Sequence, residues 1–157
     1  MNNKIINYPK ELSKINIKES DRVVLVGGCF DIIHIGHLRF LEQAKYQGSL
    51  LIVILESDDF IIKHKKRQPL HNQNERADIL ASLTMIDYVV KIPYLTGYQQ
   101  YLKLVTEINP DIIAVTAGDR QIANKSKQAS AIGAKLTIVT PLIKNQSTTE
   151  ILNKLGI

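Results

Sequence analysis

The stretch that decides the fold is Gly27-Gly28-Cys29-Phe30-Asp31-Ile32-Ile33-His34-Ile35-Gly36-His37. It follows an apolar run at 23–26 that predicts a buried strand, and it precedes a helical pattern at 38–47. A glycine-rich turn between a strand and a helix places backbone N–H groups and the positive helix end at one spot. The stretch therefore predicts a phosphate-binding turn, in which His34 and His37 add side-chain donors and Gly36 has no Cβ to block a ligand.

The rest of the chain alternates between apolar runs and helical patterns. Four further strands are predicted, at 50–55, 88–92, 112–116 and 136–139. Helices are predicted to begin near residues 57, 74, 97, 120 and 147, and a short one is predicted at 10–15. This alternation predicts an α/β fold, a Rossmann-like, doubly wound, five-stranded parallel sheet with helices on both faces.

Length and composition are typical of one soluble globular unit. We expect a single domain over residues 1–157, with residues 1–21 as an N-terminal lead-in. The one cysteine cannot form an internal disulfide, and the longest apolar run, 50–55, is far too short to span a membrane. The N-terminus lacks a secretory apolar core, so we expect a cytoplasmic protein.

The net charge of +5 suits anionic substrates, although a solvated basic surface is the commoner reason for such a value. We expect small anionic partners, and neither nucleic acid nor a membrane, although charge alone does not exclude nucleic acid.

Three segments are predicted to meet at the carboxyl edge of the sheet, where a doubly wound fold binds its ligand. They are the opening stretch, the Thr116 to Asp119 turn with Gly118 in it, and the helix start at Ser147. Ser147 with Glu150 three residues on predicts a capping box. The plain alternatives for the last two segments are a turn and a helix cap, and we expect each to serve in both roles.

The opening stretch resembles the signature of the cytidylyltransferase-like nucleotidyltransferases, Gly-x-Phe-Asp-x-x-His-x-Gly-His. All six fixed positions are present, at Gly28, Phe30, Asp31, His34, Gly36 and His37. The alternative is two histidines that cap a helix in an ordinary α/β protein. Over nearly the whole chain, the closest resemblance is to the adenylyltransferase domain of bifunctional ADP-heptose synthases. Glycerol-3-phosphate cytidylyltransferases and archaeal-type FAD synthases look similar over the same span.

Two departures from these families concern the choice of base and acceptor. Gly28 stands where the heptose enzymes usually have asparagine. Lys144-Asn145-Gln146 replaces the segments that precede Ser-Thr-Thr in the heptose enzymes and in the glycerol-phosphate enzymes. The resemblance implies transfer of a nucleoside monophosphate, AMP from ATP, to a phosphorylated acceptor such as a sugar 1-phosphate, with release of pyrophosphate. Alternatives are synthesis of a CDP-polyol such as CDP-glycerol, FMN adenylylation to FAD, and a nucleotide sensor without turnover.

The resemblance also implies site residues and a metal. Catalytic roles fall to His34 and His37, and to Lys65 or Lys66, which would close over the phosphates; the alternative for this basic loop is solvated surface charge or a nucleic-acid patch. The nucleotide-binding residues it implies are Gly28, Cys29, Phe30, Asp31, Gly36, Arg76, Thr116, Gly118, Asp119, Ser147, Thr148 and Thr149. Mg²⁺ is expected to bind through the triphosphate and water, without a side-chain cage. A homodimer is a further expectation.

Overall fold

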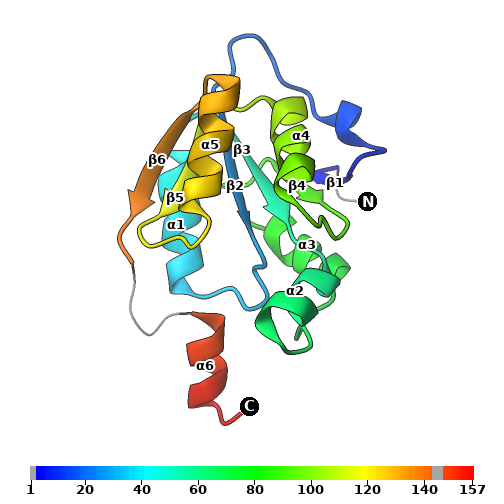
Figure 1. Ribbon diagram of the computed structural model, residues 1–157, viewed down its shortest axis with the longest axis vertical. Helices are drawn as coiled ribbons and strands as arrows, with labels where there is room; N and C mark the ends of the chain where they lie inside the picture. The colour runs from blue at the N-terminus through cyan, green and yellow to red at the C-terminus, as the bar shows by residue number, and fades with distance from the viewer. Residues whose placement is uncertain (1–2, 143–146) are drawn as a thin grey trace.

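The structure, a computed structural model, describes residues 3–142 and 147–157. It contains a parallel sheet of six strands in the order β1-β4-β3-β2-β5-β6 (Figure 1). The strands are β1 Ile5–Asn7, β2 Val23–Gly28, β3 Leu50–Leu55, β4 Tyr88–Lys91, β5 Ile112–Thr116 and β6 Lys135–Thr140. The helices are α1 Ile35–Lys45, α2 Asp58–Lys65, α3 Gln73–Ala81, α4 Tyr98–Ile108, α5 Ile122–Ile132, α6 Thr148–Lys154 and the 3₁₀ helix η1 Leu12–Lys14.

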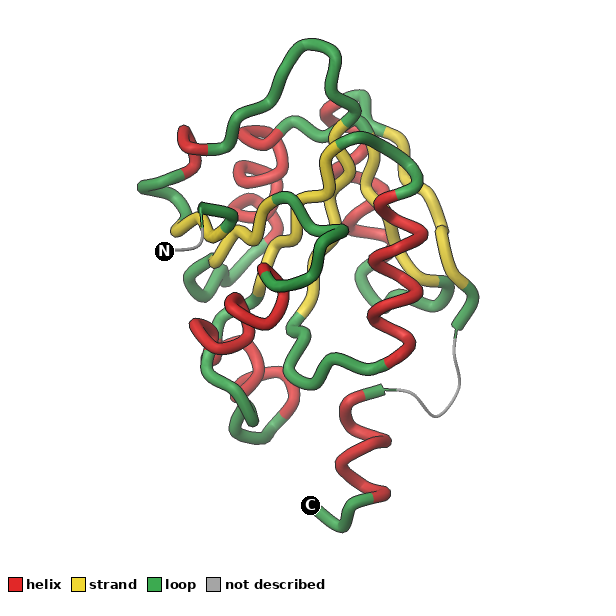
Figure 2. The backbone as a smooth tube through the Cα atoms, turned by 180° about the vertical axis from the view of Figure 1, so that it is seen from behind, coloured by secondary structure: helices red, strands yellow, loops and turns green. Residues whose placement is uncertain are grey.

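Helices cover both faces of the sheet, as the alternation predicts. Successive strand residues point to opposite faces, so that Val24 and Val26 of β2 pack in one core with α1 and α3, whereas Val23 and Leu25 pack in the other with α4 and α5. Figure 2, from behind, shows α1 in front of the sheet, on the opposite side from α4 and α5. The central strands β2, β3 and β5 are therefore buried on both sides, which is why they are continuous apolar runs.

The prediction of five strands is wrong by one. The additional strand, β1, lies in the N-terminal lead-in and pairs with β4, with Ile5 opposite Val89. Three residues at the sheet edge give too short an apolar pattern to be recognised in the sequence. The short helix predicted at 10–15 is the single 3₁₀ turn η1.

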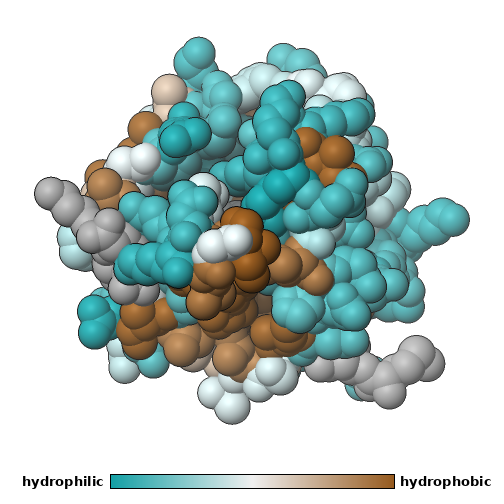
Figure 3. All heavy atoms as spheres, turned by 90° about the horizontal axis from the view of Figure 1, so that it is seen from below, coloured by the Kyte–Doolittle hydropathy of each residue, from teal (hydrophilic) through white to brown (hydrophobic). Residues whose placement is uncertain are grey.

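The strand order reverses next to β2. The chain runs from β2 to β3 and β4 on one side and then crosses to β5 and β6 on the other. The carboxyl ends of β2 and β5 therefore flank the crevice in which doubly wound sheets bind ligands. Helix α6 lies below this end of the sheet (Figure 1). Figure 3 looks at the molecule from this end, where apolar side chains gather inside a largely hydrophilic rim.

Candidate active site

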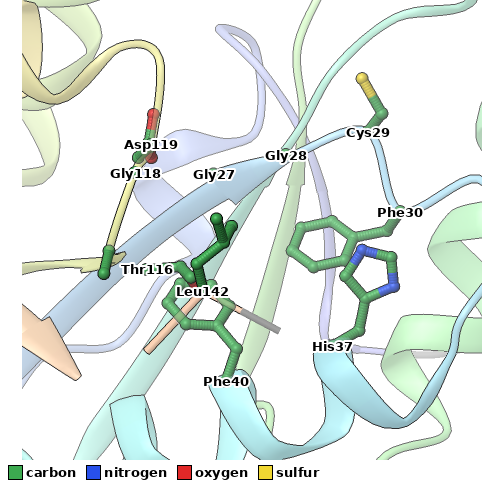
Figure 4. A pocket seen from close by; sticks show the side chains of 11 residues that line it. Gly27, Gly28, Cys29, Phe30, His37, Phe40, Thr116, Gly118, Asp119 and Leu142 are labelled. Atoms are coloured by element: carbon green, nitrogen blue, oxygen red, sulfur yellow. The ribbon is translucent and has the colours of Figure 1, made fainter. Parts of the chain in front are cut away.

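A cavity of about 240 Å³ lies in the crevice between β2 and β5. Figure 4 shows Gly27 and Gly28 along β2, with the Phe30 and His37 rings on one side and Gly118 and Asp119 on the other. The lining residues are Gly27, Gly28, Cys29, Phe30, His37, Phe40, Thr116, Ala117, Gly118, Asp119 and Leu142. The structure thus brings the opening motif and the turn after β5 together, as predicted.

The turn after β2 depends on a glycine and on an unusual backbone conformation. A Cβ added at Gly28 would lie 2.9 Å from the Phe30 ring, closer than side chains tolerate. Phe30 itself has φ 47°, in the left-handed region that non-glycine residues seldom occupy. Such a strained residue at a ligand crevice is typical of a functional turn. Any side chain larger than that of glycine at position 28 would displace the Phe30 ring.

His34 caps helix α1 with its own side chain. Its Nδ1 atom accepts hydrogen bonds from the backbone N–H of Gly36, at 3.1 Å, and of His37, at 3.4 Å. An imidazole nitrogen that accepts two amides has no proton, so the neutral ring holds its proton on Nε2. Burial lowers the pKa of His34, which favours this neutral form. His34 is therefore an oriented Nε2–H donor.

His37 stacks on His34 with 3.8 Å between ring centroids, and its other neighbour is the Phe30 ring at 5.1 Å. Burial, followed by the nearby His34, lowers the pKa of His37 to about 4. Nδ1 of His37 is buried and has no hydrogen-bond partner within the described residues. At neutral pH the cavity wall therefore presents the uncharged imidazole of His37, and His34 is stacked against it without lining the cavity.

Helix α1 uses its first amides differently from the prediction. The N–H groups of Gly36 and His37 point to the His34 ring. They are not free to hold a phosphate in this conformation, so the donors offered at the turn are the imidazoles themselves. Gly36 contributes to this cap and does not line the cavity.

Asp31, which the resemblance places among the nucleotide-binding residues, orders the motif in this structure. It is 1% exposed, and its carboxylate accepts hydrogen bonds from the Leu70 and His71 amides and forms an ion pair with Arg67 at 2.5 Å. The Asp31 pKa is lowered because these hydrogen bonds outweigh the opposing effect of burial. Asp31 thus fastens the basic loop to the motif and has no direct place in the cavity.

Arg76 is placed differently from the prediction of a direct phosphate contact. Its side chain is fully buried, and the guanidinium donates to the Cys29 carbonyl at 2.6 Å, the His71 carbonyl at 3.0 Å and the Asp58 carboxylate at 2.6 Å. No part of it is exposed to a ligand. The sequence could not reveal this, because an arginine that opens a helix has the same pattern whether it faces inward or outward. Arg76 joins the motif to α2 and α3.

The two lysines lie at the end of α2. Lys65 is its last residue and Lys66 caps it with φ 57°, both exposed. Neither forms an ion pair with another described residue. Burial raises the pKa of the Cys29 thiol to about 11, and the charge of Lys65 is the first influence that opposes this rise. Lys65 is therefore near the end of β2, although neither lysine lines the cavity.

The opposite wall is formed by the turn after β5. The Thr116 hydroxyl lies 3.0 Å from that of Thr140. The Asp119 carboxylate is bonded to the Gln121 amide and to Lys125 at 2.6 Å. Gly118, with φ 80°, has the positive backbone angle that glycine accommodates without strain. This turn presents mostly backbone to the cavity, which suits the edge of a flat base.

The predicted capping box at the start of α6 is confirmed. Ser147 Oγ accepts a hydrogen bond from the Glu150 amide, and the Glu150 side chain accepts one from the Ser147 amide. Ser147, Thr148 and Thr149 are not among the cavity-lining residues. The segment Lys144-Asn145-Gln146 lies outside the described residues.

Several residues at this edge carry no signal in the sequence. Phe40 and Leu142 line the cavity as ordinary helix and loop hydrophobes. Glu56, directly after β3, is 92% buried, and its carboxylate accepts a hydrogen bond from Tyr101 of α4. Only the topology of the sheet reveals that these residues are neighbours, because residues that meet at an edge are far apart in sequence.

Lys45 lies away from the cavity, since it is bonded to Asp87 at the opposite, amino end of the sheet.

The strand order and the crevice define a Rossmann-like, doubly wound fold. The cytidylyltransferase-like family matches residues 25–153. The chain belongs to this family, and it is an enzyme of the nucleotidyltransferase type, for which a nucleoside triphosphate and a phosphorylated acceptor are the expected substrates.

Curated relatives come from two groups. The chain is 39% identical over 106 residues to FAD synthase of Thermococcus onnurineus, an alignment of 67% of this chain and 68% of that one. It is 35% identical over 156 residues to bifunctional protein HldE of Helicobacter pylori, an alignment of 97% of this chain and 31% of that one. The chain therefore spans less than a third of the length of this HldE relative.

Solved structures confirm the fold. A lipopolysaccharide core biosynthesis protein of Thermoplasma volcanium aligns over 80% of this chain and 98% of its own, with a TM-score of 0.63 and 24% identity. Pantoate-beta-alanine ligase of Francisella tularensis aligns over 96% of this chain and 77% of its own, with a TM-score of 0.68 and 19% identity. No helix in the described ranges, 3–142 and 147–157, has the length and apolarity to cross a membrane.

Proposed function

We propose that the chain transfers AMP from ATP to a phosphorylated small metabolite and releases pyrophosphate. The observation on which this rests is the neutral imidazole pair, His34 and His37, beside the bare backbone of Gly28 where the strand order reverses. Uncharged donors at a crevice edge suit a group whose negative charge grows during reaction, as on the bridging oxygen of departing pyrophosphate.

The reaction needs alignment rather than a protein nucleophile. An oxygen of the acceptor phosphate forms a bond to the α-phosphorus while the bond from that phosphorus to the β-phosphate oxygen breaks. Nε2–H of His34 and the His37 ring donate to the triphosphate as pyrophosphate departs. Because two anions must meet, lysine charge at the rim from Lys65 would lower their repulsion.

Mg²⁺ fits this account as a component of the substrate. Within the described residues, no three His, Cys, Asp or Glu side chains gather as metal ligands. The Asp119 carboxylate, which lines the cavity, is already bonded to Lys125, and the Asp31 carboxylate in the opening motif is bonded to Arg67. We therefore propose that the metal arrives as the ATP complex, and we assign no step to a protein-bound ion.

ATP is favoured over CTP as the donor. The relatives at 35% to 39% identity include proteins named FAD synthase, whose product contains adenylate. The segment Lys144-Asn145-Gln146 has no arginine to match the guanidinium that precedes Ser-Thr-Thr in the glycerol-phosphate cytidylyltransferases. Lysine does not reproduce the bidentate geometry of that group.

A sugar 1-phosphate is the acceptor proposed first, because the HldE relatives align over nearly the whole chain. FMN is the second candidate. An aromatic cluster of Phe60, His64 and Tyr94 lies at the end of α2, with the His64 ring stacked on Phe60 at 4.3 Å and 3.4 Å from the Tyr94 hydroxyl. Such a cluster favours a planar acceptor, as do the FAD synthase relatives.

The test combines binding and turnover. Thermal stabilisation is measured with each of the four ribonucleoside triphosphates and Mg²⁺, followed by pyrophosphate release with heptose 1-phosphate, glycerol 3-phosphate and FMN. We expect ATP to give the largest shift and one acceptor to give rapid release. A preference for CTP with turnover of glycerol 3-phosphate would contradict the adenylyl assignment. Sedimentation of the same sample tests the proposed homodimer.

A further inference from the structure

Glu56 is a buried carboxyl at the carboxyl edge of the sheet that the proposed reaction does not use. It directly follows β3, and its amide donates to the Gly28 carbonyl at 3.1 Å. Its side chain is bonded on one side only, where Oε1 accepts the Tyr101 hydroxyl at 2.9 Å. The other oxygen, Oε2, is buried without a hydrogen-bond partner in the described part of the chain.

The charged groups around Glu56 do not complete its bonding. Lys125 and Arg76 influence the carboxyl electrostatically, but Lys125 is bonded to Asp119 and Arg76 to Asp58. A buried carboxyl oxygen without a donor is unfavourable, and nearly all such groups in proteins have a partner. The missing donor of Glu56 therefore lies outside the described residues, and a water molecule or a ligand group would supply it.

Glu56 does not line the cavity but adjoins it, because its amide is bonded to the carbonyl of Gly28, which does line it. The turn at Thr116 to Asp119 occupies the side of β2 toward β5 and suits the base, while His37 and Gly28 lie at the phosphates. An acceptor that attacks the α-phosphorus must extend to the remaining side, toward the ends of β3 and β4. Glu56 ends β3 on that side, and Tyr101 comes from the helix that follows β4.

We propose that Glu56, held by Tyr101, determines acceptor specificity by accepting a hydrogen bond from a hydroxyl group of the phosphorylated acceptor. The inference rests on the proposed function. The terminal torsion of a glutamate side chain is soft, so Oε2 can turn toward a bound hydroxyl. The Tyr101 hydroxyl rotates freely and keeps its bond to Oε1 as the carboxyl turns.

Burial raises the pKa of Glu56 to about 7, against the opposing effects of Tyr101, Lys125 and Arg76. The ionised carboxylate is the better acceptor, so the affinity for a hydroxylated acceptor increases as the pH rises through about 7. The phosphate of the acceptor also titrates in this range. An analogue that lacks the hydroxyl corrects for that, because its phosphate titrates in the same way.

The experiment uses the probe among heptose 1-phosphate, glycerol 3-phosphate and FMN that gives pyrophosphate release, together with its single-deoxy analogues. For the wild type we expect one analogue to lose about tenfold or more in kcat/KM, because a site built for a hydroxyl rejects its absence. Glu56→Met should have the same kcat/KM for the acceptor and for that analogue, and its KM for ATP should be unchanged. Tyr101→Phe keeps the carboxylate, so its discrimination between the acceptor and the analogue should lie between that of the wild type and that of Glu56→Met.

The outcomes separate the inference from the proposed function. Absence of pyrophosphate release with every acceptor in the wild type contradicts the function itself. Turnover with the same discrimination in Glu56→Met as in the wild type overturns the inference alone and leaves a buried water as the partner of Oε2. If Glu56→Met does not fold, Glu56→Gln decides, because it should abolish the pH dependence of the acceptor KM relative to the deoxy analogue. A dependence that persists in Glu56→Gln also overturns the inference.

Discussion

Two groups of polar side chains, one on the side of α2 and α3 and one on the side of α1, are used in opposite ways. On the side of α2 and α3, Asp31 pairs with Arg67 and Arg76 with Asp58, so these charges hold the loop and the motif together. On the side of α1, His34 and His37 are neutral and stacked; Nδ1 of His34 accepts the first amides of the helix, and the His37 ring lines the cavity. The charged side chains therefore hold the turn and the loop in place, and we propose that the uncharged imidazoles act on the substrate.

The largest effect is expected at the imidazoles. His37→Ala and His34→Ala should each lower kcat by about a hundredfold or more, since loss of one donor to developing charge costs about 2.7–4 kcal/mol. The measurement is steady-state pyrophosphate release at matched circular dichroism. His71 is an exposed histidine on the side of α3, so His71→Ala is the control and should behave as wild type. Turnover near the wild-type rate in either motif variant would remove the assigned role.

Substitutions of Arg76 test whether this side chain holds the site together or binds phosphate. Arg76→Ala leaves the Cys29 and His71 carbonyls without their donor, at a cost of about 1–3 kcal/mol in the free energy of unfolding. For a chain of this size, that lowers the thermal midpoint by about 2–4 °C per kcal/mol. Arg76→Lys should also be destabilised, because an ammonium cannot reproduce the fork. A stable Arg76→Lys with a raised KM for ATP would instead indicate a direct phosphate contact.

Glu56 gives a pH-dependent effect on stability. Its pKa is raised from 4.5 to about 7, so between these values the folded state holds a proton that the unfolded state has lost. Its contribution to the free energy of unfolding therefore falls as the pH rises, by about 1 kcal/mol from about pH 6 to about pH 8. Denaturant unfolding of wild type and Glu56→Gln at several pH values measures this difference. Parallel curves for the two proteins would show that Glu56 has an ordinary pKa.

The smallest effect is expected at the rim. Lys65→Ala should raise KM for ATP or for the acceptor a few-fold, and the remaining KM should depend less on salt, because exposed charges act over about 8–10 Å. Lys63→Ala is the matched control, since it removes the same charge from α2 but its ammonium lies 4.0 Å over the Tyr94 ring. Equal effects of the two substitutions would leave the loop as solvated surface.

Most strands and helix starts of this fold can be predicted from short stretches of the sequence. Buried strands, helix starts with capping residues and a glycine turn are local features, so β2 to β6, the Ser57 cap and the Ser147 capping box follow from short patterns. The strand β1 does not, because three edge residues acquire their meaning only from pairing with β4.

Side-chain direction is the part of the site that local patterns leave open. Arg76 and the first amides of α1 have the residue types of a phosphate site, yet tertiary partners use their donors within the protein. Glu56 and Tyr101 lie 45 residues apart and meet only because β3 ends and α4 begins at the same edge of the sheet. Long-range contacts of this kind decide which polar groups remain available to a ligand.

The fate of the α-phosphate tests the central claim most directly. ATP labelled at the α-phosphorus is incubated with Mg²⁺, the enzyme and each acceptor, and the products are separated and identified by mass. We expect the label in an adenylylated acceptor, with unlabelled pyrophosphate released in equal amount. We also expect His37→Ala to form neither product at a comparable rate. Label that leaves as free AMP, or a product that forms only from labelled CTP, would contradict it.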